Sequence, residues 1–285
     1  MIVQALVKRH ITNYLRDRWA VFFSFLSVLI ILGLFLLFLK NAFGGEFAEL
    51  PDANFVIYSW VLAGVLMVAT VTVPLGFLGI MVRDLEEKAI NDFYVSPVNR
   101  NLIVLSYLLS AVIIGMVMSV FNLAIGLIYL AVSFSYAPTV LTIISLLGLL
   151  LLSNALFSAI LFFATTYIKT SNAHGTLSTL VGTLIGFLAG LYVVIGSLPK
   201  TTQTILSALP TMQIASAFRI VYMEEALDRA FINNPDMRET YEQLLGINLT
   251  LGDTPLSLLS IIIITFMLLI IFTALSFKRV RTFKK

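Results

Sequence analysis

Long stretches of this chain carry no charged side chain, and their length sets the first expectation about its structure. Val21–Leu39 and Leu102–Val132 are two of them. Roughly 20 consecutive apolar residues are enough for a helix to cross the hydrocarbon core of a bilayer. This criterion predicts an all-α integral membrane protein. Its six transmembrane helices are expected over Trp19–Leu39, Phe55–Val82, Leu102–Phe134, Thr139–Ile168, Thr176–Leu198 and Leu256–Phe277.

The overall composition excludes most other classes of protein. Hydrophobic residues make up 59% of the 285 positions and charged residues 12%, about half the charged share of a typical soluble domain. The net charge of +3 is too small to suggest a nucleic-acid partner. The chain has no cysteine, so a disulfide framework, a thiolate metal site and a cysteine nucleophile are all ruled out.

The distribution of basic residues predicts the orientation in the membrane. Six spans place both termini on the same side, and segments that face the cytoplasm carry an excess of Lys and Arg. With both termini in the cytoplasm, 13 of the 18 Lys and Arg residues lie inside. We therefore expect an N-in, C-in topology. The inner segments are then 1–18, 83–101, 169–175 and 278–285.

Residues 1–18, before the first span, have the pattern of an amphipathic interfacial helix. Apolar residues recur at i,i+4, while Lys8, Arg9 and Arg16 lie elsewhere around the helix. Such a helix is expected to lie along the inner membrane surface. The apolar stripe consists of Val3, Val7, Ile11 and Leu15, with Leu6 alongside.

The sequence contains neither an energy source for transport nor an enzyme site. The phosphate-binding motif G-x-x-x-x-G-K-[ST] is absent, and no Gly is followed by Lys anywhere. The span interiors contain no ionisable residue, which disfavours coupling to an ion gradient. His10 and His174 fall near the inner surface, where a solvated or interfacial role is expected in preference to a proton relay. We therefore expect no catalytic residue and no metal site.

The inner segment 83–101, between the second and third spans, is unusual for its acidic residues. Residues 83–94 have a helical pattern, in which Leu85, Ala89 and Phe93 form a narrow apolar stripe. Four carboxylates on the side where positive charge is the rule favour docking of a partner protein. A helical turn that simply lies on the membrane surface is the alternative. The charge pairs expected at i,i+4 are Asp84–Lys88, Arg83–Glu87 and Lys88–Asp92.

Small residues and a proline mark two of the spans. In the second span Pro74, with Gly76 and Gly79, permits a kink, which serves either as a hinge for alternating access or as a static bend. In the fifth span three glycines spaced by four are expected on one face, where they let another helix approach closely. These glycines are Gly182, Gly186 and Gly190.

The outer segment 199–255 contains an amphipathic stretch, Met212–Phe231. This stretch is expected to dip into the outer membrane interface. Ile214, Phe218, Val221, Tyr222 and Leu227 form its apolar side, and Arg219, Glu224, Glu225 and Asp228 lie elsewhere around it.

Two motifs resemble those of a known family. The run Glu86-x-Lys88 … Phe93-x-x-Ser96-Pro97-Val98-x-Arg100, after the second of six spans, resembles the cytoplasmic loop of ABC-2 type transporter permeases. The fifth-span run Gly182-x-x-x-Gly186-x-x-x-Gly190-Leu191-Tyr192 … Gly196-Ser197-Leu198-Pro199, followed by Leu209-Pro210 and Arg219, is also similar to that family. In the loop the chain departs from the commoner Gly-Thr-x-Glu pattern, because it reads Lys88-Ala89-Ile90-Asn91.

The resemblance implies the membrane half of an ABC exporter with a type V-like transmembrane domain over residues 1–285. Two such permease subunits would pair, as a homodimer or a related heterodimer, through their first and fifth spans. ATP and Mg would bind two separate ATP-binding subunits. The segment 83–101 would then carry a coupling helix seated in a groove of the ATPase. Its coupling residues would be Asp84, Leu85, Glu86, Glu87, Lys88, Ala89, Ile90, Asp92 and Phe93.

Further expectations follow from the resemblance. The helix in 1–18 would also meet the ATPase, and 199–255 would form a short re-entrant helix pair over the exit path. The passenger would be an amphipathic or hydrophobic drug, peptide, lipid or glycan precursor, exported across a bacterial cytoplasmic membrane. The alternatives are a secondary transporter or channel that works without ATP, and a membrane anchor that moves nothing.

Overall fold

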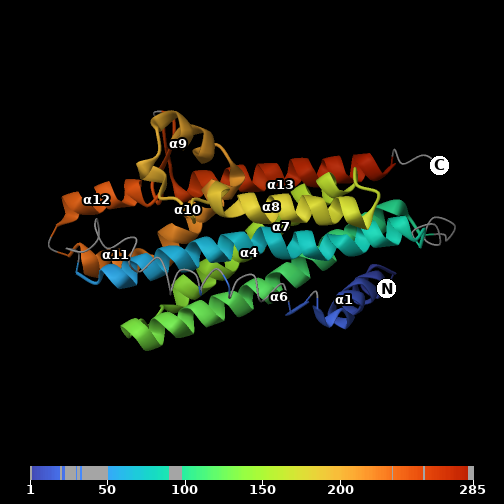
Figure 1. Ribbon diagram of the computed structural model, residues 1–285, viewed down its shortest axis with the longest axis horizontal. Coiled ribbons are helices and arrows are strands. Elements are labelled where there is room, and N and C mark those ends of the chain that lie inside the picture. The colour runs from blue at the N-terminus through green and yellow to red at the C-terminus, as the bar shows by residue number, and fades with distance from the viewer. Residues whose placement is uncertain are drawn as a thin grey trace.

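The computed structural model describes residues 2–19, 21–22, 30, 33, 51–89, 98–232, 234–252 and 254–281. Four of its helices are long and apolar enough to cross a membrane. They lie side by side in one elongated bundle (Figure 1). These helices are α4 (Ala53–Glu86), α6 (Arg100–Phe134), α7 (Val140–Thr165) and α13 (Leu258–Arg281).

Four of the six predicted spans are thereby confirmed as long apolar helices. They are the second, third, fourth and sixth, and each begins and ends within four residues of its expected bounds. The predicted first span, Trp19–Leu39, lies almost entirely outside the described residues. The predicted fifth span is corrected below.

The helix α4 is the centre of the bundle. In its most apolar window 83% of the residues are buried, against 11% in the corresponding window of α13. It packs against α6, α7 and α8 (Ser171–Leu188) as well as against the outer segment. A helix that is apolar all round is expected in such a buried position. Movement of α4 therefore affects nearly every other element.

Side-chain caps precede three of the helices. The Asn99 side chain accepts the Asn101 N–H before α6, and Thr139 Oγ1 accepts the Thr142 N–H before α7. Thr170 caps α8 in the same way through the Ala173 N–H. Each cap satisfies a backbone donor that the first turn of a helix leaves free.

The predicted fifth span, Thr176–Leu198, is wrong at both ends. The helix α8 begins earlier, at Ser171, and ends at Leu188. Gly190 follows with φ +60°, and the N–H groups of Gly190 and Leu191 donate to the carbonyls of Phe187 and Gly186. This is a Schellman ending, which a residue without Cβ adopts most easily. The turn stops α8 where the run of apolar residues continues.

The helix α1 (Ile2–Arg16) lies against α6 and the end of α4. It forms where an amphipathic helix is expected, but the face that meets the protein carries Leu6, His10 and Tyr14. Leu15, from the predicted apolar stripe, is exposed. Figure 1 shows α1 and the C-terminal end of α13 at the same end of the bundle.

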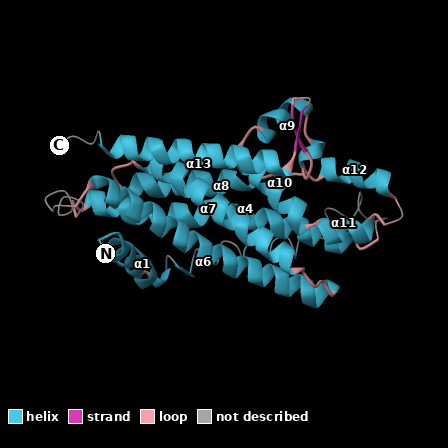
Figure 2. Ribbon diagram, turned by 180° about the vertical axis from the view of Figure 1, so that it is seen from behind, coloured by secondary structure: helices cyan, strands magenta, loops and turns pink. Residues whose placement is uncertain are grey.

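A folded segment covers the opposite end of the bundle (Figure 2). The antiparallel hairpin within it has two three-residue strands, too short for the sequence pattern to have indicated. The helices α9 and α10 meet at 88°. The segment consists of η2 (Ile195–Ser197), α9 (Lys200–Ser207), α10 (Pro210–Tyr222), α11 (Glu224–Ala230), α12 (Pro235–Leu244), β1 (Leu249–Leu251) and β2 (Thr254–Leu256).

Arg219 of α10 is fully buried, although the sequence pattern had placed it away from the apolar side. Its Nη2 donates to the carbonyls of Ala189 and Gly190, at 3.0 and 2.8 Å, and its Nη1 to the carbonyl of Gly246 at 3.3 Å. The guanidinium also lies 5.1 Å from the ring centroid of Trp60. Arg219 therefore joins α4, α8, α10 and the end of α12.

The partners of Arg219 are backbone carbonyls at the ends of helices. Ala189 and Gly190 follow the last turn of α8, and Gly246 follows α12. The C-terminal end of a helix carries partial negative charge, so two helix ends converge on one cation. A buried charge is tolerated only when it is paired or well hydrogen-bonded. These carbonyls take the place that a carboxylate would otherwise fill.

We expect Arg219→Ala to destabilise the folded protein by about 2–4 kcal/mol, because it leaves three buried carbonyls without a donor. Thermal unfolding in detergent, followed by tryptophan fluorescence, measures the change. Arg238→Ala is the matched control, since Arg238 makes exposed ion pairs with Asp228 and Glu242. Pairs of that kind contribute about 1 kcal/mol or less. Equal losses of stability in the two variants would contradict this account of Arg219.

Candidate functional site

The last turn of α4 carries a buried carboxylate, Asp84, whose side chain is only 7% exposed. It lies close to the first turns of α6, which packs against α4. A buried carboxylate requires a cation or several hydrogen-bond donors. The donors come from elements far apart in the sequence.

Arg9 of α1 and Tyr107 of α6 supply these donors. Arg9 Nη1 lies 2.9 Å from Asp84 Oδ2, and Nη2 lies 3.1 Å from Oδ1, which makes the pair bidentate. The Tyr107 hydroxyl donates to Asp84 Oδ2. Bidentate pairs between Arg and a carboxylate fix orientation as well as adding energy. The hydrogen bond with Asp84 raises the pKa of Arg9.

His10 completes this group, which we call the inner cluster: Arg9, His10, Asp84, Ser106 and Tyr107. The His10 ring stacks on Tyr107 with centroids 4.0 Å apart, and its Nε2 lies 3.2 Å from Ser106 Oγ. Ser106 donates its own hydrogen to the Ile103 carbonyl. The Ser106 oxygen therefore accepts from His10 Nε2–H, and His10 Nδ1 is left to face Arg9 Nη1 at 3.4 Å.

The inner cluster keeps His10 neutral. Burial is the main cause, the charge of Arg9 adds to it and the charge of Asp84 opposes it, so that the pKa falls from 6.5 to about 4. The sequence had indicated a solvated or interfacial histidine. The structure corrects that expectation, because His10 is completely buried.

A second contact joins the end of α4 to the beginning of α8. Glu86 accepts hydrogen bonds from the Ser171 N–H at 2.9 Å and from the Ser171 hydroxyl. A carboxylate at the N-terminal end of a helix is stabilised by the helix dipole. Two residues in one turn of α4 thus hold three other helices: Asp84 holds α1 and α6, and Glu86 holds α8.

Residues 83–86 of the predicted helix 83–94 form the end of α4, and residues 90–94 lie outside the described residues. The helix α4 runs on to Glu86, and Lys88 then has φ +60°. The expected pair between Asp84 and Lys88 is replaced by the pair of Asp84 with Arg9. Leu85 and Ala89 are half-buried, and Glu87 and Lys88 are exposed. The remaining predicted coupling residues, Ile90, Asp92 and Phe93, lie outside the described residues.

The three glycines of the fifth span do not share one helix face, because Gly190 lies beyond the end of α8. A Cβ on Gly186 would lie 2.2 Å from Tyr192 Cε2, so its small size serves a contact within the chain. A Cβ on Gly182 would meet nothing within 4 Å among the described residues. Gly182 is therefore the one of the three whose Cβ position is open within the described part of the chain.

The candidate hinge residues also differ from one another. Pro74 lies inside α4, which continues as a helix through it. A Cβ on Gly76 would meet nothing within 4 Å in the described part of the chain. A Cβ on Gly79 would lie 3.2 Å from the ring of His174. The sequence had indicated a solvated or interfacial His174, but the structure buries it.

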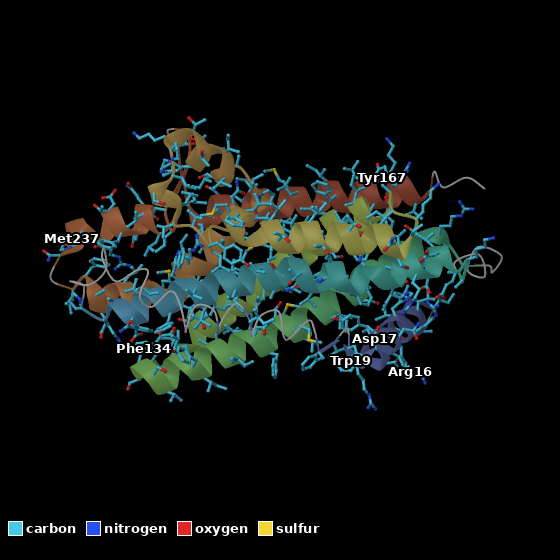
Figure 3. All side chains as sticks on the ribbon, viewed as in Figure 1. Arg16, Asp17, Trp19, Phe134, Tyr167 and Met237 are labelled. Carbon is cyan, nitrogen blue, oxygen red and sulfur yellow. The ribbon has the colours of Figure 1, made fainter. Side chains whose placement is uncertain are left out.

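The inner cluster lies at the end of the bundle that holds α1. Figure 3 shows Arg16 and Asp17 beside α1, with Phe134 and Met237 at the opposite end. Tyr167, after α7, lies toward the end that holds α1, and Arg279 of α13 lies 4.4 Å from its ring centroid. Within the described residues no group of three or more His, Cys, Asp or Glu could hold a metal ion.

We expect Asp84→Asn to release α1, because Arg9 loses the charge that holds it, at a cost of about 3 kcal/mol. Spin labels at Gln4 and Lys169, both exposed, would report a longer and broader distance. The natural absence of cysteine makes such labelling direct. Glu87→Gln, a matched change at an exposed position three residues on, should leave the distance unaltered. An unaltered distance in Asp84→Asn would contradict the anchoring role.

Docking of α1 should also weaken as the pH falls. Docked His10 has a pKa of about 4 and released His10 an ordinary value of 6.5. The released state therefore binds more protons between these values, and docking loses about 1.4 kcal/mol per pH unit there. The contribution of His10 to the docking of α1 is therefore fully present above pH 6.5. The spin labels at Gln4 and Lys169 measure the docking of α1 as a function of pH. In His10→Gln this docking should depend less on pH between 4 and 6.5. An identical pH dependence in the variant would show that His10 is not the titrating group.

Comparison with known proteins identifies a family for most of the chain. Residues 2–223 match the family described as ABC-2 type transporter. A search of curated proteins finds no match for the chain. The matched region extends from α1 to α10 and so includes the whole inner cluster and Arg219. With several apolar helices and a match over most of its length, the chain belongs to the ABC-2 type transporter family and is a multi-pass membrane protein, a transporter permease.

Proposed function

We propose that this permease is the membrane subunit of an ATP-driven exporter and that the inner cluster transmits the motion of the ATPase. The observation that supports this most directly is the double anchoring of the last turn of α4. Asp84 and Glu86, at the beginning of the predicted docking segment 83–101, hold α1, α6 and α8. A displacement of that segment is passed on to four helices at once.

In this proposal two permease subunits pair and two ATP-binding subunits bind below them. ATP and Mg lie on those subunits, and this chain contributes no catalytic residue. The exposed Glu87 and Lys88, with the segment that follows them, dock in a groove of the ATPase. The inner cluster then faces the cytoplasm, which gives an N-in, C-in orientation in a bacterial cytoplasmic membrane.

The proposed passenger is amphipathic or hydrophobic. Large apolar side chains dominate the exposed faces of the helices, where they meet lipid or a lipid-like passenger. Examples are Val117, Ile128 and Val132 on α6 and Ile263, Phe266 and Ile270 on α13. Drugs, peptides, lipids and glycan precursors all have this character.

Affinity purification from native membranes in mild detergent tests the proposal. We expect a stoichiometric ATP-binding protein to be recovered and identified by mass spectrometry. Glu87→Lys should reduce its recovery severalfold through charge reversal at the docking segment, while Asp228→Lys, an exposed change at the opposite end, should not. Glu87 is chosen over Glu86 because Glu86 accepts the hydrogen bonds of Ser171 at the start of α8.

The opposite outcome is equally clear. A preparation of this chain alone, which transports without ATP after reconstitution into liposomes, would establish the secondary transporter or channel instead. Full recovery of the ATPase with Glu87→Lys would show that the segment around Glu87 does not dock the ATPase, but it would not contradict the exporter function.

A further inference from the structure

His174, in the first turn of α8, contacts α4 just beyond its proline. Its Nε2 lies 3.1 Å from the carbonyl oxygen of Leu75, and the ring is buried between the two helices. A carbonyl only accepts, so Nε2 carries the proton of the neutral ring. The contact therefore supplies Leu75 with a donor from outside its own helix.

The Leu75 carbonyl lies one residue beyond Pro74, in a stretch of α4 that also contains Gly76 and Gly79. Pro74 has no N–H, so the carbonyl of Thr70, four residues earlier, has lost its helical donor. The Leu75 carbonyl faces the N–H of Gly79 in the helical pattern. With His174 it has a second donor. The Leu75 carbonyl is thus a place where a group outside α4 can replace the helix's own hydrogen bond.

Gly79 makes this contact sterically feasible. A Cβ at position 79 would lie 3.2 Å from His174 Cδ2 and 3.3 Å from Nε2, closer than such atoms normally approach. Gly76, three residues earlier, faces open space among the described residues. The two glycines therefore differ in kind: one makes room for the histidine and the other does not.

We propose that His174 is a positioning residue for bending of α4, and that it donates to the Leu75 carbonyl when the bond from Gly79 opens. Opening one helical hydrogen bond within an apolar bundle normally leaves a carbonyl without a donor, which is costly. His174 removes that cost on the acceptor side. The inner end of α4 is tied to the same turn of α8 by Glu86 and Ser171, so both ends of the bending segment are held by α8.

This inference rests on the proposed function, because a transport cycle is what gives bending its purpose. If His174 favours opening of the helical bond in α4, its loss should slow the opening; if it only stabilises the closed helix, its loss should speed the opening. Hydrogen exchange of the α4 amides around Gly79, measured on the chain alone in lipid nanodiscs, reports how often that bond opens. In His174→Leu we expect exchange to slow roughly fivefold to tenfold, the factor that one hydrogen bond carries. Faster or unchanged exchange overturns the proposal.

Matched variants exclude a general loss of packing. Gly79→Ala displaces the histidine ring and should slow exchange as His174→Leu does. Gly76→Ala introduces the same methyl group into open space and should leave exchange near the wild-type rate. His174→Gln retains an N–H donor of similar reach and should restore at least part of the opening. Equal effects of the two alanine variants overturn the proposal.

A second measurement connects the bend with nucleotide. Spin labels at Asn54 and Arg83, exposed positions near the two ends of α4, report its end-to-end distance in the complex with the ATPase. ATP with vanadate should produce a shorter population, which His174→Leu loses and His174→Gln keeps. A bound and active ATPase without any shorter population refutes the bend but leaves the exporter intact. If no ATPase binds, the exporter fails, and hydrogen exchange still decides the role of His174.

Discussion

A charge removed from water must find a partner, and this bundle is organised around the two places where that happens. At one end Asp84 receives a guanidinium and a phenol from two other helices. At the opposite end Arg219 receives the carbonyls that terminate two helices. Most other side chains of α4 are apolar, and apolar contact sets no particular neighbour; Glu86, which accepts from Ser171, and Trp60, which donates to the Leu245 carbonyl, are exceptions. The charged contacts therefore specify which helices meet and in what register.

The two charged sites differ in how easily they can be taken apart. Arg9 is partly exposed, so water can solvate it when α1 moves away. Arg219 is fully buried and is joined to backbone atoms that cannot rotate away. A permease needs one end that responds to its surroundings and one that keeps its shape. The inner cluster has the first property and the contacts of Arg219 have the second.

The sequence predicted what depends on long-range averages and missed what depends on single contacts. The second, third, fourth and sixth spans were indicated by their length alone, since no other structure suits such apolar runs. The early end of α8 was missed because its apolar residues continue past Gly190, where a left-handed turn overrides them. His10, Arg219 and Ser171 were misplaced or overlooked because their partners lie 96, 30 and 85 residues away. A sequence pattern carries no information about such pairs.

The short length of α8 has a consequence for the membrane itself. Eighteen residues rise only about 27 Å, and the first turns are polar, while a hydrocarbon core is about 30 Å thick. Lipid beside α8 must therefore thin, or its headgroups must descend toward the turn at Gly190. The neighbouring α4 has 34 residues and makes no such demand. A bilayer that thins beside α8 displaces the neighbouring acyl chains from their resting depth.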